Sequence, residues 1–222
     1  MDRCADLIKE LRRNGSKRNI TAMARFGIGT DSALGVPIPV LRSIAKRNGS
    51  DHALALELWD TGIHEAQILA CYLAEPEKLT ECQMEKWVHD FDSWGVCDQV
   101  CGNLFDRTKF AYRKALEWSM ADEEYVKRAG FVMMAVLAIH DKHASDAQFI
   151  SFFSRILKGS YDERNFVKKA VNWSVRQIGK RNDTLLPRAI ELAVEIQNTG
   201  SRSGRWIAAD ALRELMPLMD DE

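Results

Sequence analysis

Apolar residues recur at every third or fourth position along most of the chain, which is the spacing of one face of an α-helix. Leu7 and Leu11 show this spacing near the start, and Leu54 and Leu58 show it again further along. No segment alternates apolar and polar residues for long enough to predict a half-buried strand. The pattern therefore predicts an all-α protein of about twelve helices of roughly 10–18 residues, joined by short loops.

Residues that favour helix ends stand where several periodic stretches begin and stop. Asp51, Thr80 and Asp183 each precede such a stretch, and their side chains can accept a hydrogen bond from the first turn of a helix. Gly62 and Gly200 follow the first and the third of these stretches, as glycine often does. The expected last residues of the three helices are Trp59, Val88 and Ile196.

One short segment occurs twice. Lys-Ala-Leu-Glu-Trp-Ser-Met at 114–120 is followed 55 residues later by Lys-Ala-Val-Asn-Trp-Ser-Val at 169–175. The spacing is slightly above the roughly 40–47 residues of HEAT and armadillo repeats. It favours an α-solenoid of HEAT-like antiparallel helix pairs (an α-α superhelix) over a closed helix bundle. We expect residues 1–222 to form a single HEAT-like repeat domain.

Charge is distributed unevenly although the net charge of the chain is only −1. Residues 1–50 carry a net charge of +6 and residues 158–205 a net charge of +5, whereas residues 51–92 carry −8. Two basic segments could form one positive face if the fold brings them to the same side, which would suit nucleic acid. On charge alone, solvated helix faces are the preferred explanation of the pattern.

Composition excludes several classes of protein. Hydrophobic residues make up 46% of the chain and charged residues 28%, so it is not a disordered protein. No apolar run approaches the roughly 20 residues of a membrane span. The start of the chain is charged from Asp2 onward, unlike a secretory signal. Five cysteines without a zinc-ribbon spacing are typical of a reducing compartment, so we expect a cytoplasmic protein.

Common catalytic signatures are missing from the sequence. There is no nucleophile elbow, no phosphate-binding glycine loop and no zinc-protease motif. His140 and His143 are expected to be polar residues at a helix end, and Cys97 and Cys101 to pack as small apolar groups. The dipeptide at 64–65, His-Glu, is expected on a helix surface. We therefore expect neither a metal nor a cofactor.

Tryptophan is the residue type that stands out. Trp94 and Asp98 are four residues apart, which places them on one face of a helix. Trp173 and Arg176 are three apart, and Trp206 follows Arg202 and Arg205. Each tryptophan by itself is explained by core packing. An aromatic ring beside a carboxylate in a basic groove would instead stabilise a cation held against nucleic acid.

Four motifs are spread along nearly the whole chain. They are Met-Ala-Arg-Phe at 23–26 with the Leu-Gly-Val and Pro-x-x-Arg of 34–42, Ser-Trp-Gly-Val-Cys-Asp at 93–98, Val-Lys-Arg-Ala at 126–129, and Phe-Val-Lys-Lys-Ala-Val-Asn-Trp-Ser-Val-Arg at 166–176. Together they resemble the motifs of the DNA alkylation repair glycosylases of the AlkD type, which are built from HEAT-like repeats. The segment 166–176 is the most specific match.

The resemblance implies a role for several residues. Asp98 would be the catalytic carboxylate, and Trp94 and Trp173 would be aromatic walls beside the deoxyribose of the lesion. Arg128 would contact the DNA backbone, and Arg176 would lie near the same groove. Further basic residues expected to contact phosphates are Lys168, Lys169, Lys180, Arg181, Arg202 and Arg205.

Two positions depart from the pattern of the family. Phe26 stands where a tyrosine is common, which removes a hydroxyl that could reach a phosphate. Gly95 replaces an acidic residue often found after the tryptophan. Neither change affects the carboxylate or the two tryptophans, so they bear on affinity and lesion preference more than on activity.

The implied reaction needs few catalytic groups from the protein. A purine alkylated at N3 or N7 is already cationic and leaves as a neutral base, so no general acid is needed. Positive charge then develops on the sugar, where an ionised Asp98 would stabilise it and could orient the attacking water. Aromatic faces would add cation–π attraction of about 0.5–2 kcal/mol each. The resemblance also implies that the base is removed without complete flipping.

The sequence therefore predicts a monomeric DNA glycosylase that removes 3-methyladenine and 7-methylguanine types of lesion from duplex DNA in base excision repair. The alternative is a non-catalytic HEAT-repeat module that binds DNA or another protein. Asp98 favours the enzyme, because a binding module gains nothing from a carboxylate that faces phosphates.

Overall fold

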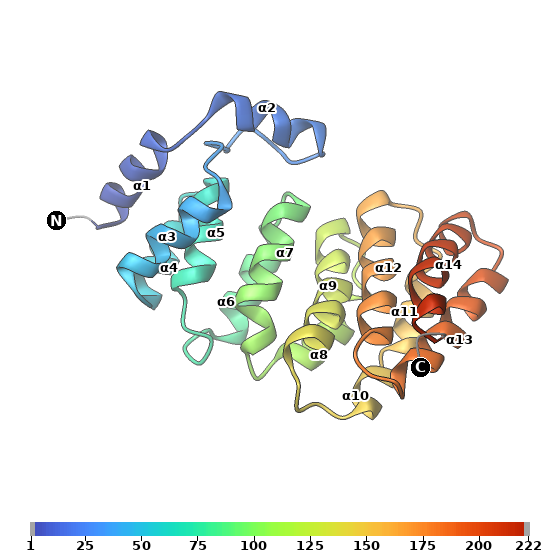
Figure 1. Cartoon of the computed structure of the whole chain (residues 1–222). Helices are drawn as coiled ribbons and strands as arrows, with labels where there is room; N and C mark the ends of the chain where they lie inside the picture. Colours follow the sequence, from blue (N-terminus) through green and yellow to red (C-terminus); the bar gives the residue numbers. More distant parts are fainter. Residues whose placement is uncertain (1–2, 220–222) are drawn as a thin grey trace. The chain divides into compact units, whose positions relative to one another are not determined.

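The computed structural model describes residues 3–219 and contains no strand within them. Fourteen α-helices and two short 3-10 helices account for most of this span (Figure 1). The chain divides into two compact units, Met1–Lys109 and Phe110–Glu222, here called unit 1 and unit 2. The expected all-α class is confirmed, with two more α-helices than the periodicity suggested.

Unit 1 contains seven α-helices and one 3-10 helix among its described residues. In chain order they are α1 (Arg3–Arg13), α2 (Lys17–Arg25), α3 (Ile38–Asn48), α4 (His52–Asp60), α5 (His64–Leu73), α6 (Glu81–His89), α7 (Trp94–Asn103) and η1 (Phe105–Arg107). Helix α5 packs against α3, α4 and α7. Nine of its ten residues are buried, because it has neighbours on several sides.

Two tryptophans form the aromatic centre of unit 1. Trp59 of α4 and Trp87 of α6 are almost fully buried, and their rings stack with centroids 3.9 Å apart. Trp59 Nε1 donates a hydrogen bond of 2.8 Å to Asp90, which satisfies its one polar atom. For these two tryptophans the prediction of core packing is confirmed.

Unit 2 contains seven α-helices and one 3-10 helix among its described residues. In chain order they are α8 (Ala111–Trp118), α9 (Glu124–His140), α10 (Asp146–Ile150), α11 (Phe153–Gly159), α12 (Asn165–Gly179), α13 (Leu185–Asn198), α14 (Arg202–Leu215) and η2 (Met216–Met219). Helix α9 packs against α8 and α12, and α12 packs in turn against α13 and α14. Neighbouring helices thus stack one pair on the next.

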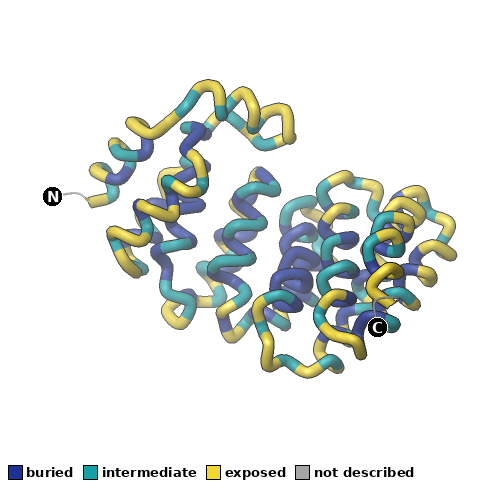
Figure 2. The backbone as a smooth tube through the Cα atoms, viewed as in Figure 1, coloured by how far each residue is buried: buried dark blue, intermediate teal, exposed yellow. Residues whose placement is uncertain are grey.

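Helix α9 is the core of unit 2. Every residue from 128 to 138 is buried, as expected for a helix that is apolar on all sides (Figure 2). Gly130 lets α9 lie close to the backbone that follows α8, because a Cβ atom there would lie only 2.3 Å from the backbone nitrogen of Ser119. Ser119 belongs to the first of the two repeated segments, residues 114–120, and Trp118 of the same segment is buried.

The predicted helix starts are confirmed at two of three positions. Asp51 accepts a hydrogen bond from Leu54 N, and Thr80 forms a capping box with Gln83. The prediction for Asp183 is wrong. Helix α13 begins at Leu185, whose N–H donates to the side chain of Asn182 at 2.9 Å, so the residue before Asp183 supplies the oxygen.

Within the described residues, no helix is both long enough and apolar enough to cross a membrane.

Candidate active site and nucleic-acid interface

Helix α7 carries the two central candidates of unit 1. Ser93 caps the helix by accepting a hydrogen bond from Val96 N, which fixes where the first turn begins. Trp94 is the first residue of the helix and Asp98 lies one turn later, so both side chains share one face. Both are half-buried, whereas Val96 and Cys97 between them are buried in the core. The predicted placement of Trp94 and Asp98 on a common helix face is confirmed.

The indole of Trp94 is held in place by a distant part of the chain. Its Nε1 donates a hydrogen bond of 2.9 Å to the backbone oxygen of Phe26, 68 residues earlier. Phe26 directly follows α2, and its own side chain is 68% exposed. The position of this tryptophan therefore depends on the segment that links α2 to α3.

Glu65 anchors the other end of that segment. Its carboxylate accepts hydrogen bonds from the backbone nitrogens of Leu34 at 2.8 Å, Gly35 at 2.6 Å and Val36 at 3.3 Å. Gly35 has a φ of +77°, and a Cβ there would lie 2.3 Å from Ser16 O, so only glycine fits. The loop is thus fixed by one buried carboxylate.

The prediction that His64 and Glu65 lie on a helix surface is wrong. Glu65 is 1% exposed and His64 4% exposed. The N-terminal turn of α5 is covered by the 32–36 loop, and Glu65 satisfies backbone groups that would otherwise be buried without partners. Periodicity could not reveal this, because a buried acid that binds a loop has the same spacing as an exposed one.

His64 lies against the start of α7. A Cβ atom on Gly95 would lie 3.4 Å from its Cε1 and 3.4 Å from Ile28 Cδ1. Burial lowers the pKa of His64, although the nearby carboxylates of Glu65 and Asp92 act in the opposite direction. His64 is therefore a buried ring that packs beside the helix bearing Trp94.

The cysteines near Asp98 are not suited to act as nucleophiles. Cys97 and Cys101 are fully buried, as the sequence predicted. Burial raises the pKa of the Cys101 thiol, and the neighbouring Cys97 and Asp98 raise it further. Both thiols are enclosed in the core, whereas Asp98 is only half-buried on the face of α7 that carries Trp94.

Trp173 lies on α12 in unit 2 and is also half-buried. With the Gln177 amide turned so that its oxygen faces them, Trp173 Nε1 and Lys180 Nζ both lie 3.2 Å from that oxygen and can donate to it. Gln177 follows Trp173 by one helical turn. The indole is thus positioned by its own helix.

A ladder of side-chain pairs joins α12 to α14, with each partner 38 residues later in the chain. Asn172 donates to Asp210 at 2.7 Å, and Arg176 pairs with Glu214. When the residue number on α12 increases by four, the number of its partner on α14 also increases by four. The two helices therefore run parallel. Lys180 adds a second ion pair to Glu214. Two of the predicted phosphate contacts, Arg176 and Lys180, therefore have acidic partners.

Two further arginines from the predicted set bind backbone oxygens inside unit 2. Arg128 is 6% exposed, and its guanidinium donates to Phe166 O at 2.5 Å. Arg181 donates to Ala138 O and Ala144 O, both at 3.0 Å, and lies over the ring of Phe149. These bonds hold both guanidinium groups against the backbone of unit 2.

The remaining basic candidates surround the N-terminal parts of α12 and α14. Lys169, Arg202 and Arg205 are exposed, and Lys168 is half-buried. Arg205 donates to Gly200 O at the end of its own loop. Lys169 and Arg202 make no ion pair within residues 3–219. Lys169 and Arg202 are thus exposed cationic side chains at this end of the two helices.

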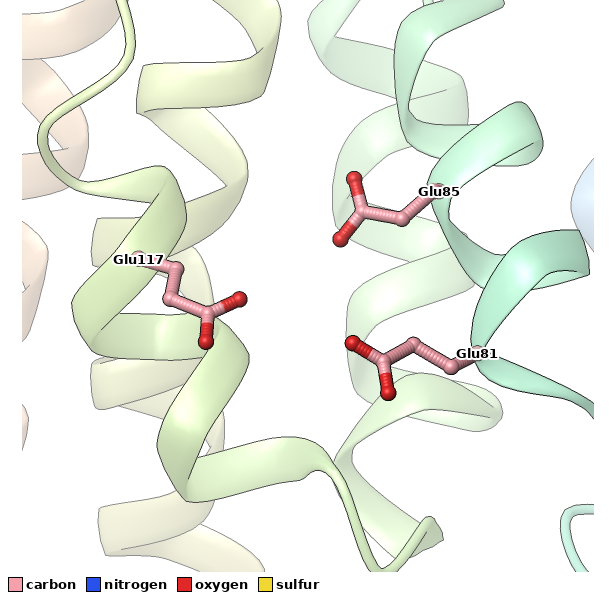
Figure 3. Close-up of side chains that lie close together, drawn as sticks. All are labelled: Glu81, Glu85 and Glu117. Carbon is pink, nitrogen blue, oxygen red and sulfur yellow. The ribbon is translucent and has the colours of Figure 1, made fainter.

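Figure 3 labels three acidic side chains on other helices, Glu81 and Glu85 of unit 1 and Glu117 of unit 2. Glu81 and Glu85 lie one turn apart on α6 and belong to the acidic segment 51–92. Glu117 on α8 accepts hydrogen bonds from Lys114 and Arg113, and the bond from Lys114 is the main reason that its pKa lies below the ordinary value.

The predicted site draws on both units. Trp94 and Asp98 belong to unit 1, whereas Arg128, Trp173 and Arg176 belong to unit 2. That they meet at one place stays a prediction, as does the single-domain behaviour of residues 1–222.

The fold of this chain is similar to that of a known protein. A solved structure is described as that of a new family of proteins related to the HEAT-like repeat DNA glycosylases with affinity for branched DNA structures. It has a TM-score of 0.75 and 22% sequence identity, and the match covers 86% of this chain and 82% of that one. The likeness confirms the predicted α-solenoid of HEAT-like repeats. No curated protein matches the sequence.

The family comparison is consistent with the fold. The model of a family described as DNA alkylation repair enzyme matches residues 7–215, which is nearly the whole described chain. This chain belongs to the DNA alkylation repair enzyme family.

Proposed function

We propose that the protein is a DNA glycosylase that removes cationic N-alkylated purines, such as 3-methyladenine and 7-methylguanine, from duplex DNA. The observation that supports this most is the pairing of Trp94 with Asp98 on the partly exposed face of α7. Membership of the alkylation repair family and the HEAT-like fold agree with it.

Asp98 would act on the charge that develops during bond cleavage. As the glycosidic bond breaks, the base leaves neutral and the sugar becomes cationic, so a fixed carboxylate stabilises the transition state more than the ground state. Trp94, fixed by Phe26 O, and Trp173, fixed by its own helix, would present aromatic faces to the same cation. Asp98 could also orient the attacking water.

Lys168, Lys169, Arg202 and Arg205 are the proposed phosphate contacts with the best supporting geometry. They are gathered at the N-terminal ends of two parallel helices and have few acidic partners. Such contacts bind any duplex sequence, and each phosphate neutralised adds about −0.9 to the slope of log affinity against log salt. Arg176 and Lys180 would contribute less while Glu214 holds them.

A second function is supported by the structural neighbour alone. That protein is described as having affinity for branched DNA structures. The corresponding proposal for this chain is a non-catalytic module that binds DNA. It predicts binding without release of base, which separates it from the first proposal.

Asp98→Asn tests the enzyme proposal, because it keeps the size of the side chain and removes its charge. We expect excision of 7-methylguanine from duplex DNA to slow by about 10²–10³-fold, the usual cost of one well-placed electrostatic group. Duplex affinity should stay equal or rise slightly, since a negative charge near phosphates is lost. Released base is measured by chromatography under single-turnover conditions, and affinity by fluorescence anisotropy.

Asp92→Asn is the matched control, because Asp92 is exposed and precedes the same helix. It removes one negative charge from the same region without touching the face shared by Trp94 and Asp98. We expect excision close to that of the unmodified protein. Excision by Asp98→Asn at the unmodified rate would refute the mechanism, and no excision by the unmodified protein would favour the binding module.

A further inference from the structure

Trp206 is an exposed tryptophan that the proposed excision reaction does not use. It lies in the first half of α14, and its side chain is 40% exposed. Arg202 precedes it by one helical turn, so the two side chains share a face. The other two tryptophans of unit 2 are less exposed to solvent, since Trp118 is buried and Trp173 half-buried.

A cation lies on the ring of Trp206. Lys168 of α12 places its Nζ 5.1 Å from the ring centroid, at the first step of the ladder that joins α12 to α14. At the later steps of the same ladder, Asp210 and Glu214 occupy the positions on α14 that correspond to Trp206. The ladder thus changes from aromatic and basic at its N-terminal end to ion-paired at its C-terminal end.

The acidic groups near this end are already bound. Glu163 accepts a hydrogen bond from Ser203 N, and Asp162 is held by Lys127 and Arg164. Ser201 caps the helix by accepting from Gly204 N. The N–H groups of Ser203 and Gly204 are therefore satisfied within the protein, so an anion at this end would bind to the cationic side chains of Lys168 and Arg202.

We propose that Trp206, with Lys168 and Arg202, forms a binding site for an unpaired base and its flanking phosphates in single-stranded DNA. An exposed indole offers a stacking surface to any base, and the two cations fit the phosphates on either side. Stacking of a base on an aromatic ring is stronger than an exposed cation–π contact. A base can therefore displace the flexible Lys168 from the ring, which frees its ammonium group for a phosphate.

This site rests on the proposed binding of DNA but not on the chemistry of Asp98. It would hold a single-stranded stretch beside the duplex, as at a gap or a frayed end. Its occupant is a stacked base with phosphates. An acidic protein segment would also satisfy the cations, but it would not need the aromatic ring.

The test compares a blunt duplex with the same duplex carrying a single-stranded thymidine tail. We expect the tail to raise affinity, and Trp206→Ala to remove that gain, at a loss of about 5- to 140-fold for the tailed DNA. Affinity for the blunt duplex should change little. Trp206→Phe should keep most of the gain, since it keeps a ring.

Two controls separate stacking from other causes. Tyr161→Ala removes another exposed aromatic side chain of unit 2 and should leave the gain intact. A tail of abasic nucleotides keeps the phosphates and lacks the bases, so it should give little gain. Lys168→Gln should reduce the salt slope for tailed DNA by about 0.7.

Three results would overturn the proposal: equal affinity for blunt and tailed DNA, a gain that survives Trp206→Ala, or an equal gain from the abasic tail. Circular dichroism verifies that each variant is folded. Excision from the blunt duplex is measured in parallel. Excision without a tail effect refutes this site alone, and a tail effect without excision refutes the glycosylase proposal alone.

Discussion

The two units fix their candidate tryptophans in different ways. In unit 1, Trp94 donates to a carbonyl 68 residues earlier, and the segment that carries this carbonyl is itself held by buried Glu65. In unit 2, Trp173 faces the amide of Gln177 one turn along the same helix. One indole therefore depends on tertiary structure and the other on local helical structure.

This difference predicts which mutations disturb the surroundings of each tryptophan. Changes in the 26–36 segment or in Glu65 should disturb Trp94 while Trp173 stays in place. Changes in the ladder between α12 and α14 should alter the charge around Trp173 without moving it. Mutations can test both statements, beginning with the largest expected effect.

Glu65→Gln should destabilise unit 1 by about 2–4 kcal/mol. The amide can accept hydrogen bonds through only one of its two end atoms, so the N–H of Leu34 or that of Gly35 is left without an acceptor. Excision should fall as well, because the segment that holds Trp94 is loosened. Urea denaturation followed by circular dichroism gives the free energy of unfolding.

Glu57→Gln on α4 is the control for this change, since Glu57 is exposed. Its free energy of unfolding should stay within about 0.5 kcal/mol of the original. If Glu65→Gln changed the free energy of unfolding as little as Glu57→Gln, the 34–36 loop would not depend on the carboxylate. The contrast between the two units would then fail.

Glu214→Gln should cost about 0.5–1 kcal/mol at neutral pH, because partly exposed ion pairs contribute modestly. Partial burial acts to raise the pKa of Glu214, but hydrogen bonds from Lys180 and Arg176 outweigh it and hold the pKa below its ordinary value of 4.5. A carboxyl with a lowered folded pKa stabilises the protein above its unfolded pKa. That stabilisation is lost as the pH falls below about 4.5 through the folded pKa.

Two measurements follow from this reasoning. The drop in melting temperature below about pH 4.5 should be smaller in Glu214→Gln than in the unmodified protein. The salt slope of duplex binding should steepen by about 0.9 for each of Arg176 and Lys180 that then reaches a phosphate. Glu195→Gln, an exposed change on α13, should alter neither. An unchanged salt slope would argue against DNA contacts by Arg176 and Lys180.

Gly95→Ala should have the smallest effect and the opposite sign. A Cβ atom at this helical position would meet His64 and Ile28 at 3.4 Å, which is ordinary contact. Replacing a helical glycine should therefore stabilise unit 1 by about 0.5 kcal/mol. Gly62→Ala should instead destabilise it, since Gly62 has a φ of +65°. Destabilisation by Gly95→Ala would mean that α7 packs more tightly on α5 than the geometry implies.

Local sequence signals predicted much of the secondary structure. Asp51 and Thr80 cap helices as expected, because a capping side chain bonds to backbone only three residues away. The pairing of Trp94 with Asp98 on one face follows from helical spacing alone. The wrong prediction for Asp183 concerned a choice between neighbouring polar residues, where Asn182 supplies the oxygen instead. Spacing does not distinguish between such neighbours.

The sequence by itself thus determined the all-α class, several helix ends and which residues share a helix face, because these depend on neighbours within one or two turns. Tertiary structure decided which charges are available. It buried Glu65 under a loop, turned Arg128 and Arg181 inward to backbone oxygens, and paired Arg176 with Glu214. Charged residues have the same periodicity whether they face solvent, a carbonyl or an opposite charge, so only the packing of distant segments distinguishes these outcomes.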